Sequence, residues 1–172
     1  DNLKSVIDTV NSLKLAELQN YFGNNCIIDA FIQEEVDQIV DATTAVFSTI
    51  ILEDKTAIIL SIKGRKEYRW YNKPREEVVE EINEFRKGLQ RVRKNFNKEA
   101  SQGIYKWMIA PFDDYLQASG IKTLVFIHDG ILQSVPMAAL YDGNEFLIQK
   151  YAIATTPSLS LTDPKPLNRQ DL

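Results

Sequence analysis

The chain contains one cysteine, Cys26, and one histidine, His128, and together these residue types can form a catalytic pair. An imidazolium next to a thiol lowers the thiol pKa and produces a nucleophilic thiolate. The neighbouring residues favour other roles. Cys26 follows Gly-Asn-Asn and precedes two isoleucines, a setting in which a free cysteine acts as a small apolar side chain. His128 ends an apolar run at a turn, so we interpret both residues as structural.

His128 begins a His-Asp-Gly segment that could bind a ligand or simply form a turn. In the structural interpretation, which we favour, Asp129 accepts hydrogen bonds from nearby backbone amides and Gly130 adopts a positive φ. Further along, Pro136 and the small pair Ala138-Ala139 would let a loop or short helix lie close to a sheet.

Two clusters of aromatic and basic residues could suggest nucleic-acid binding. One is the segment Tyr68-Arg69-Trp70-Tyr71, and the other comprises Arg86, Lys87, Arg91, Arg93 and Lys94. Binding would require aromatic and basic side chains on one face. Five glutamates between residues 76 and 84 precede the second cluster on the same predicted helix, as the helix dipole favours. The chain has a net charge of −4 and a pI near 5.1. We therefore expect a solvated helix face and no nucleic-acid partner.

The composition is that of a globular protein of one domain, with 172 residues, 44% of them hydrophobic and 26% charged. A single cysteine permits no intramolecular disulfide, which fits a reducing compartment. The first residues do not resemble a signal peptide, and no apolar run is long enough to cross a membrane. We expect a cytoplasmic protein with no cofactor, no metal and no membrane partner.

The first half of the chain predicts helices followed by three strands. Apolar residues recur every three to four positions over 3–22, whereas 26–42 could be a helix or a strand. Three β-rich runs over 44–72, separated by short polar breaks, predict an antiparallel meander. Its buried face is expected to take one residue from each of four pairs: Val46 or Phe47, Ile50 or Ile51, Ile58 or Ile59, and Tyr68 or Trp70.

The second half predicts two helices and two strands. An amphipathic helix follows Pro74 and extends to Phe96, and a second runs from Asn97 with an interruption at Pro111 and an end at Gly120. Residues 121–127 lack alternation, which is typical of an inner strand, and 145–155 are a further strand candidate. We expect an α/β fold with α+β features that is incomplete, because the inner strand needs neighbours on both sides and the chain offers few.

The stretch LVFIHDGILQSVPMAALYDGNEFLIQKYAIATTPSLSL resembles the first half of a CHAT domain, a caspase-like domain often joined to tetratricopeptide repeats in bacteria. Members commonly show a strand, Pro-Asp-Gly, a segment ending in Leu-Pro-Phe-Ala-Ala-Leu, an Asp-Gly turn, a further strand and Pro-Ser-Leu. The matching structural positions here are Asp129, Gly130, Pro136, Asp142, Gly143 and Pro157. His128 departs from the pattern, because it occupies the place of the family's proline. The meander, the helix IYKWMIAPFDDYL and the segment LKLAELQNYFGNNC fit the same half-domain, so the resemblance extends from about Leu13 onward.

The resemblance implies how the chain is organised and what its parent does. Residues 1–40 would be a helical linker after upstream repeats, and 41–172 the N-terminal half of the caspase-like domain. The family's catalytic His and Cys would lie beyond Leu172, so no catalytic residue is carried over. The chain would be an inactive scaffold fragment of a cysteine peptidase that acts on proteins. The alternative is a non-catalytic interaction module, and an exposed strand edge would favour self-association in either case.

Overall fold

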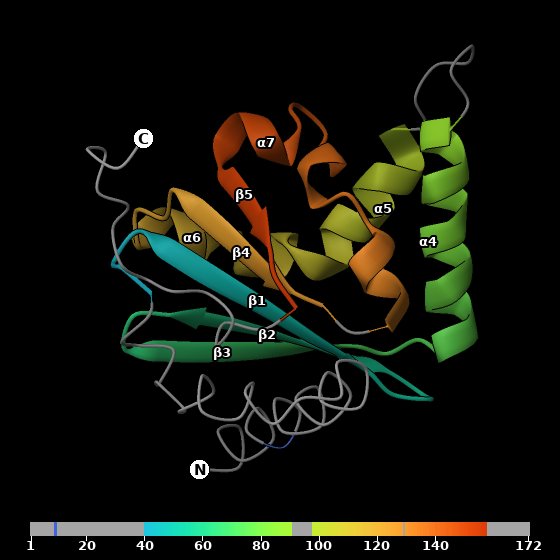
Figure 1. Cartoon of the computed structure of the whole chain (residues 1–172), viewed down its shortest axis with the longest axis horizontal. Helices are drawn as coiled ribbons and strands as arrows, with labels where there is room; N and C mark the ends of the chain where they lie inside the picture. The colour runs from blue at the N-terminus through green and yellow to red at the C-terminus, as the bar shows by residue number, and fades with distance from the viewer. Residues whose placement is uncertain (1–8, 10–39, 91–97, 129, 158–172) are drawn as a thin grey trace, which may run out of the picture.

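The computed structural model describes residues 9, 40–90, 98–128 and 130–157. Several predictions concern residues outside this part: the helix over 3–22, the ambiguous segment up to residue 39, Cys26, Asp129 and the tail after Pro157. The described elements form one sheet of five strands with helices packed against it (Figure 1).

The predicted meander is confirmed. It consists of β1 (Thr44–Ile51), β2 (Thr56–Ile62) and β3 (Arg65–Tyr71), joined by antiparallel pairing. β-Branched residues dominate β1 and β2, as expected for strands that pack against neighbours. The turn between β2 and β3 contains Gly64 at φ +75°, a conformation that a residue with a side chain rarely adopts.

The meander continues into the strands of the second half. β4 (Thr123–Ile127) pairs with β1, β5 (Ala152–Thr155) pairs with β4, and both pairings are parallel. The strand order is β3-β2-β1-β4-β5, so β4 is an inner strand, as its unbroken apolar sequence indicates. The expectation that this strand lacks neighbours is wrong, because β1 and β5 occupy both of its edges. The result is a mixed sheet of the α+β class.

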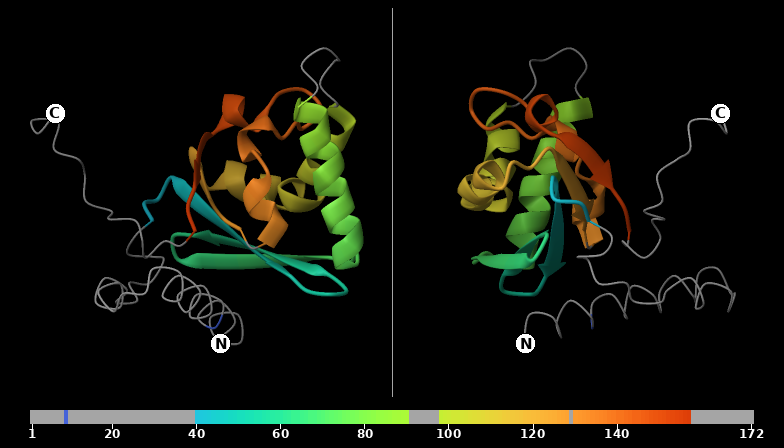
Figure 2. Two further views of the ribbon diagram at one scale, coloured as in Figure 1. Left: turned by 45° about the vertical axis from the view of Figure 1, so that its right-hand side comes forward. Right: turned by 90° about the vertical axis from the view of Figure 1, so that its left-hand side faces the viewer.

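The helices of the described part of the chain lie on one face of the sheet (Figures 1 and 2). α4 (Arg75–Gln90) starts immediately after Pro74, and α5 (Lys98–Met108) follows residues 91–97, which are not described. Pro111 lies in a 3-10 turn, η1 (Ala110–Phe112), after which α6 (Asp113–Ala118) restarts the helix. Gly120 then adopts φ +63°, so Pro111 and Gly120 act as predicted.

The segment between β4 and β5 is mostly short helices rather than strand. It contains η2 (Gly130–Ser134), η3 (Met137–Ala139) and α7 (Leu147–Lys150). The predicted strand over 145–155 is therefore wrong for its first part. The Gln149 side chain accepts a hydrogen bond from the Phe146 amide (2.7 Å), which caps the turn, and only Ala152–Thr155 is extended.

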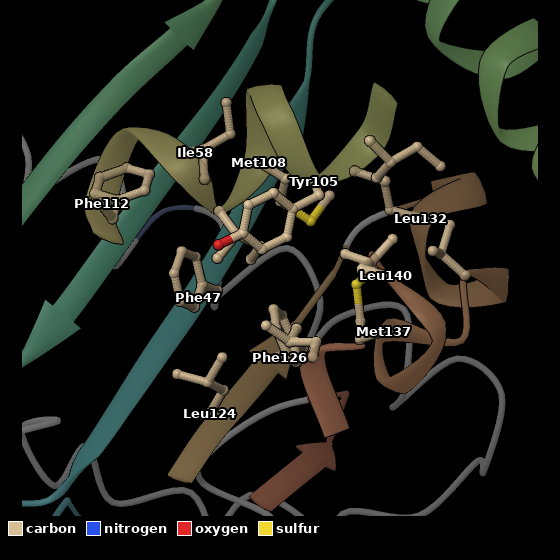
Figure 3. Packing of buried hydrophobic residues seen from close by; sticks show 14 of the residues in the cluster. Phe47, Ile58, Tyr105, Met108, Phe112, Leu124, Phe126, Leu132, Met137 and Leu140 are labelled. Atoms are coloured by element: carbon tan, nitrogen blue, oxygen red, sulfur yellow. The ribbon is translucent and has the colours of Figure 1, made fainter. Parts of the chain in front are cut away.

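The main core lies between the sheet and the helices (Figure 3). At its centre the Phe47 ring stacks on Phe126 (5.4 Å between centroids) and meets the Phe112 ring edge-on (5.6 Å). Phe47, Ile51 and Ile58 supply the predicted buried face of the meander. The prediction for the fourth pair is wrong. Tyr68 and Trp70 lie on the opposite face of the sheet and are 49% and 45% exposed.

One carboxylate joins β3, α4 and α5. Glu81 accepts hydrogen bonds from the Tyr71 hydroxyl (2.9 Å), the Trp107 indole nitrogen (3.1 Å) and the Lys73 ammonium (2.8 Å). The rings of Tyr71 and Trp107 also stack with their centroids 4.6 Å apart. Burial first, and then the bond to Glu81, raises the pKa of Tyr71. This contact fixes the helices to the end of the sheet.

Candidate functional site

The carboxyl ends of the parallel strands β1, β4 and β5 meet at one edge of the sheet. In open sheets with parallel strands, ligands commonly bind at such an edge. His128 follows β4 at this edge, and its Nδ1 lies 2.9 Å from Oγ1 of Thr49 on β1. Thr156, which follows β5, donates its amide to the Phe126 carbonyl (3.0 Å). The edge is therefore the first place to look for chemistry.

The pair formed by Thr49 and His128 has the atoms of a nucleophile and its base, but a substrate cannot reach it. The exposed fractions of the two residues are 0% and 1%. The imidazole stacks on the Phe126 ring (5.2 Å), and Gln133 Nε2 donates to the His128 carbonyl (3.2 Å). A catalytic hydroxyl needs an open approach to the reacting carbonyl. The pair instead links β1 to the end of β4, which agrees with the structural interpretation of His128.

The motif residues that follow His128 lie in the turns η2 and η3, which connect β4 to the segment that contacts α5. Gly130 opens η2 at φ +51°, and Pro136 precedes η3 in an extended conformation. The Ser101 hydroxyl on α5 donates to the Ala139 carbonyl (2.7 Å), so the small residues of η3 lie against this helix. Pro157 is exposed after β5. Asp129 and Cys26 lie outside the described residues, so the geometry of a Cys26–His128 pair is not part of the described structure.

Asp142 and Gly143 form a tight turn before α7. One carboxylate oxygen of Asp142 accepts the amides of Asn144 (2.7 Å) and Glu145 (2.8 Å). Gly143 adopts φ +115°, a backbone conformation that favours glycine. A Cβ there would lie 2.9 Å from Gln102 Nε2, the end of a flexible side chain that would have to move. The other Asp142 oxygen accepts from the Lys150 ammonium (3.1 Å), which ties the turn to α7.

A partly buried polar cluster surrounds this turn and was not foreseen from the sequence. It consists of Tyr105 on α5, Asp113 on α6, and Asp142, Lys150 and Tyr151. The Tyr105 hydroxyl donates to both oxygens of Asp113 (2.9 and 2.7 Å), and the Lys150 ammonium lies 5.9 Å from the Tyr105 ring centroid. These contacts connect two helices with the segment that carries the Asp-Gly turn.

Burial and pairing shift the pKa values of the carboxyl groups in this cluster in opposite directions. Burial raises the pKa of Asp113, and the hydrogen bond from Tyr105 and the charge of Lys150 only partly offset it. Burial also opposes ionisation of Asp142, but the amides of Glu145 and Asn144 together with Lys150 outweigh it and lower its pKa. Burial and the neighbouring Asp113 raise the pKa of Tyr105. Hydrogen bonds join Tyr105 to Asp113 and Lys150 to Asp142, and they hold this segment against α5 and α6.

The described residues offer no metal centre. Within 40–90, 98–128 and 130–157, no three carboxylate, imidazole or thiol side chains gather so that they could hold a metal ion. Among the helices of this same part of the chain, none is both long and apolar enough to cross a membrane.

Comparison with known families agrees with this arrangement. Residues 98–171 match the model of the CHAT domain, and the matched segment contains α5, α6, β4, α7, β5 and the motif loops between them. The resemblance inferred for residues before 98 is not covered by the match. No curated protein matches the chain. The C-terminal part of this chain, residues 98–171, is therefore similar to the CHAT domain family, in line with a partial CHAT domain.

Proposed function

We propose that the chain supplies the N-terminal scaffold of a CHAT-type, caspase-like domain, and that it is catalytically inactive alone. The parent protein would be a cysteine peptidase whose catalytic His and Cys follow the strands described here. Residues 1–40 would link this domain to upstream repeats, and 41–172 would form its first half. The composition and the single cysteine support a cytoplasmic location for the parent.

The family match at residues 98–171 supports the CHAT-type domain, and the burial of His128 carries the part of the proposal that makes the chain inactive alone. His128 is the one histidine of the sequence and lies inside the segment that matches the CHAT family. Its exposed fraction is 1%, and its Nδ1 is taken up by Thr49. A general base has to reach the proton that it abstracts. The matched segment therefore supports a positioning role and leaves the chemistry to other residues of the parent.

The reactivity of Cys26 tests the proposal. We expect iodoacetamide to alkylate Cys26 of the full chain no faster than it alkylates a synthetic peptide of residues 20–30, at every pH from about 6 to 9. A peptidyl fluoromethyl ketone should show no saturable, thiol-dependent labelling. The control is Thr49→Val, which removes the contact to His128 and should leave the alkylation rate unchanged.

Alkylation much faster than that of the peptide would contradict the proposal, above all if Thr49→Val or His128→Ala removed the excess rate. Near-UV circular dichroism of the aromatic side chains reports whether each variant keeps its native fold, so a loss of folding can be recognised. A saturable reaction with the fluoromethyl ketone would have the same meaning.

We also propose that the chain self-associates through β5. This strand is outermost on its side among the described residues, and Ala152, Ala154 and Thr155 are exposed. An open strand edge pairs readily with a second copy around a two-fold axis. Sedimentation equilibrium should show a monomer–dimer equilibrium that Ala154→Lys shifts toward monomer, while Ile148→Lys on α7 does not. A monomer at all concentrations would refute this pairing.

The second candidate function is a non-catalytic interaction module. The exposed aromatic pair of Tyr68 and Trp70 on β3 favours it, since large apolar side chains exposed together often mark a partner surface. The two candidates differ in the parent protein. A His-Gly motif and a later Cys at a strand end would support the peptidase, and other residues at those places would support the interaction module.

A further inference from the structure

The outer edge of β3 combines two chemistries on its two faces. Among the described residues β3 pairs only with β2, so it is the outermost strand at its end of the sheet (Figure 1). Strand residues alternate between faces. Tyr68 and Trp70 lie on the face away from the helices, while Arg65, Glu67 and Arg69 lie on the helix face. Arg69 is therefore separated from the exposed rings of Tyr68 and Trp70.

The face away from the helices presents an exposed aromatic pair. Tyr68 and Trp70 are close to half exposed, and their rings meet edge-to-face with centroids 6.4 Å apart. The Lys55 ammonium lies 4.6 Å from the centroid of the Trp70 ring, so one side of the indole is occupied by a cation. The pair is an apolar contact surface bordered by positive charge.

The helix face presents two arginines that are already held in position. The Arg65 guanidinium lies 4.5 Å from the ring centroid of Tyr115, and the Arg69 guanidinium lies 5.5 Å from that of Phe112. Glu67 lies between them, with contacts of 2.8 Å to Arg65 and 3.7 Å to Arg69. Both arginine side chains remain substantially exposed, at 53% and 40%. The ring contacts restrict the motion of both side chains, which lowers the cost of ordering them when an anion binds.

The charge of β3 restricts what can occupy its edge. The strand carries three basic residues and one acidic residue, although the whole chain has a net charge of −4. A second copy of β3 would bring like charges together, which is unfavourable. A nucleic acid would need many phosphate contacts, and the net charge of −4 on the chain opposes them. An extended protein segment, whose own side chains alternate, can reach both.

We propose that the β3 edge binds an extended acidic protein segment in which carboxylate and apolar side chains alternate. The segment adds to the sheet as a sixth strand beside β3. Its apolar side chains lie on Tyr68 and Trp70, and its carboxylates pair with Arg65 and Arg69. The Arg69 guanidinium, which now donates to the Tyr68 carbonyl (2.7 Å), turns to the incoming carboxylate. β3 itself lies outside the residues that match the CHAT family. The proposal does not depend on a peptidase function of the parent, and it rests on the same aromatic pair as the interaction module.

The first test is binding of defined peptides to the full chain. A fluorescent heptapeptide that alternates valine and glutamate should bind at least about tenfold more tightly than a peptide of the same composition with its glutamates in one block. N-methylation of alternate backbone amides, on the side that faces β3, should remove binding. Equal affinity for the alternating and block peptides would overturn the proposal, as would tighter binding of a single-stranded oligonucleotide.

Variants of β3 make the test specific. Tyr68→Ser and Trp70→Ser should each weaken binding about tenfold, as expected for aromatic anchors. The matched controls Leu89→Ser and Ile148→Ser replace exposed apolar residues on helices and should have no effect. Arg69→Glu should reverse the preference, so that an alternating valine–lysine peptide now binds more tightly. Because this is a gain of binding, a misfolded variant cannot mimic it.

The free chain provides a last check. The Trp70 indole should be quenched by acrylamide in the free chain and become protected when the peptide is added. If Trp70 is already protected in the free chain, another segment of the same protein covers this surface and the proposal fails. If the β3 variants leave peptide binding unchanged, the peptide binds elsewhere and the proposal also fails.

Discussion

Replacement of Phe47 by alanine is expected to lower the free energy of unfolding by about 3–5 kcal/mol. Phe47 is fully buried and contacts the rings of Phe126 and Phe112, so its removal leaves a cavity at the junction of β1, β4 and η1. Denaturation by urea, followed by circular dichroism, measures the loss.

Two variants control the Phe47 experiment. Phe47→Leu keeps most of the apolar volume and should cost clearly less than the alanine. Leu89→Ala removes a side chain that is 36% exposed on α4 and should change stability little. A loss below about 1 kcal/mol for Phe47→Ala would mean that β1 does not pack on the CHAT-matched segment.

The second large effect concerns the pair of Tyr105 and Asp113. Tyr105→Phe removes the donor to both carboxylate oxygens of a partly buried aspartate, and we expect it to cost about 1–2 kcal/mol at neutral pH after allowance for partial exposure. Asp113→Asn keeps an oxygen acceptor for the tyrosine and removes the buried charge, so its loss should be smaller. In the Asp113→Asn background, Tyr105→Phe should lower the free energy of unfolding by less, because the side chain at position 113 that loses its donor is then uncharged. Equal costs in both backgrounds would contradict a direct coupling.

The same pair predicts a pH dependence whose sign follows from the pKa of Asp113. Because burial raises this pKa above the ordinary 3.8, the folded protein binds the proton more tightly than the unfolded chain does. The contribution of Asp113 to stability is therefore greatest below 3.8, declines as pH rises through the folded value, and is constant above it. Asp142, whose pKa is lowered, has the opposite effect: its contribution is present above 3.8 and is lost as pH falls through its folded value.

Asp113→Asn isolates this effect. Relative to the native protein, the variant should gain stability as pH rises through the folded pKa of Asp113, while the contribution of Asp142 stays the same in both proteins. Urea denaturation at a series of pH values from about 3 to 7 measures the difference. Parallel stability curves would show that Asp113 titrates normally in the folded state.

Local patterns predicted most of the individual elements. The β-branched runs over 44–72 gave the meander, and the unbroken apolar run ending at Ile127 indicated an inner strand. Pro111 and Gly120 marked the interruption and the end of the second helix correctly. These features depend on neighbouring residues, through backbone sterics and the alternation of side chains, so the sequence carries them directly.

Features that depend on distant partners were missed. Nothing local indicates that β1 pairs with β4 in parallel, and the sequence therefore offered few neighbours for β4. The exposure of Tyr68 and Trp70 depends on what packs on the second face of the sheet, which alternation alone does not specify. For 147–150, a side-chain cap on Phe146 outweighed a strand-like sequence.

In the candidate site, too, local features were predicted from the sequence and contacts between distant residues were not. The Asp-Gly turn at Asp142 was recognisable because it forms within four residues. Thr49 and His128 are 79 positions apart, and Tyr105 reaches Asp113 only because Pro111 breaks the helix between them. A tyrosine in the apolar stripe of a helix gives no sign that its hydroxyl will meet a carboxylate.

The measurement that tests the account most directly is amide hydrogen exchange on β1 and β4. The central claim is that the meander and the CHAT-matched segment form one cooperative sheet, although the family match begins only at residue 98. We predict that the slowest amides of β1 and β4 exchange with the same free energy of opening, and that Phe47→Ala lowers both by the same amount. If Phe47→Ala abolished protection in β1 while β4 and α5 kept theirs, the two parts would be separate folding units and the claim would be wrong.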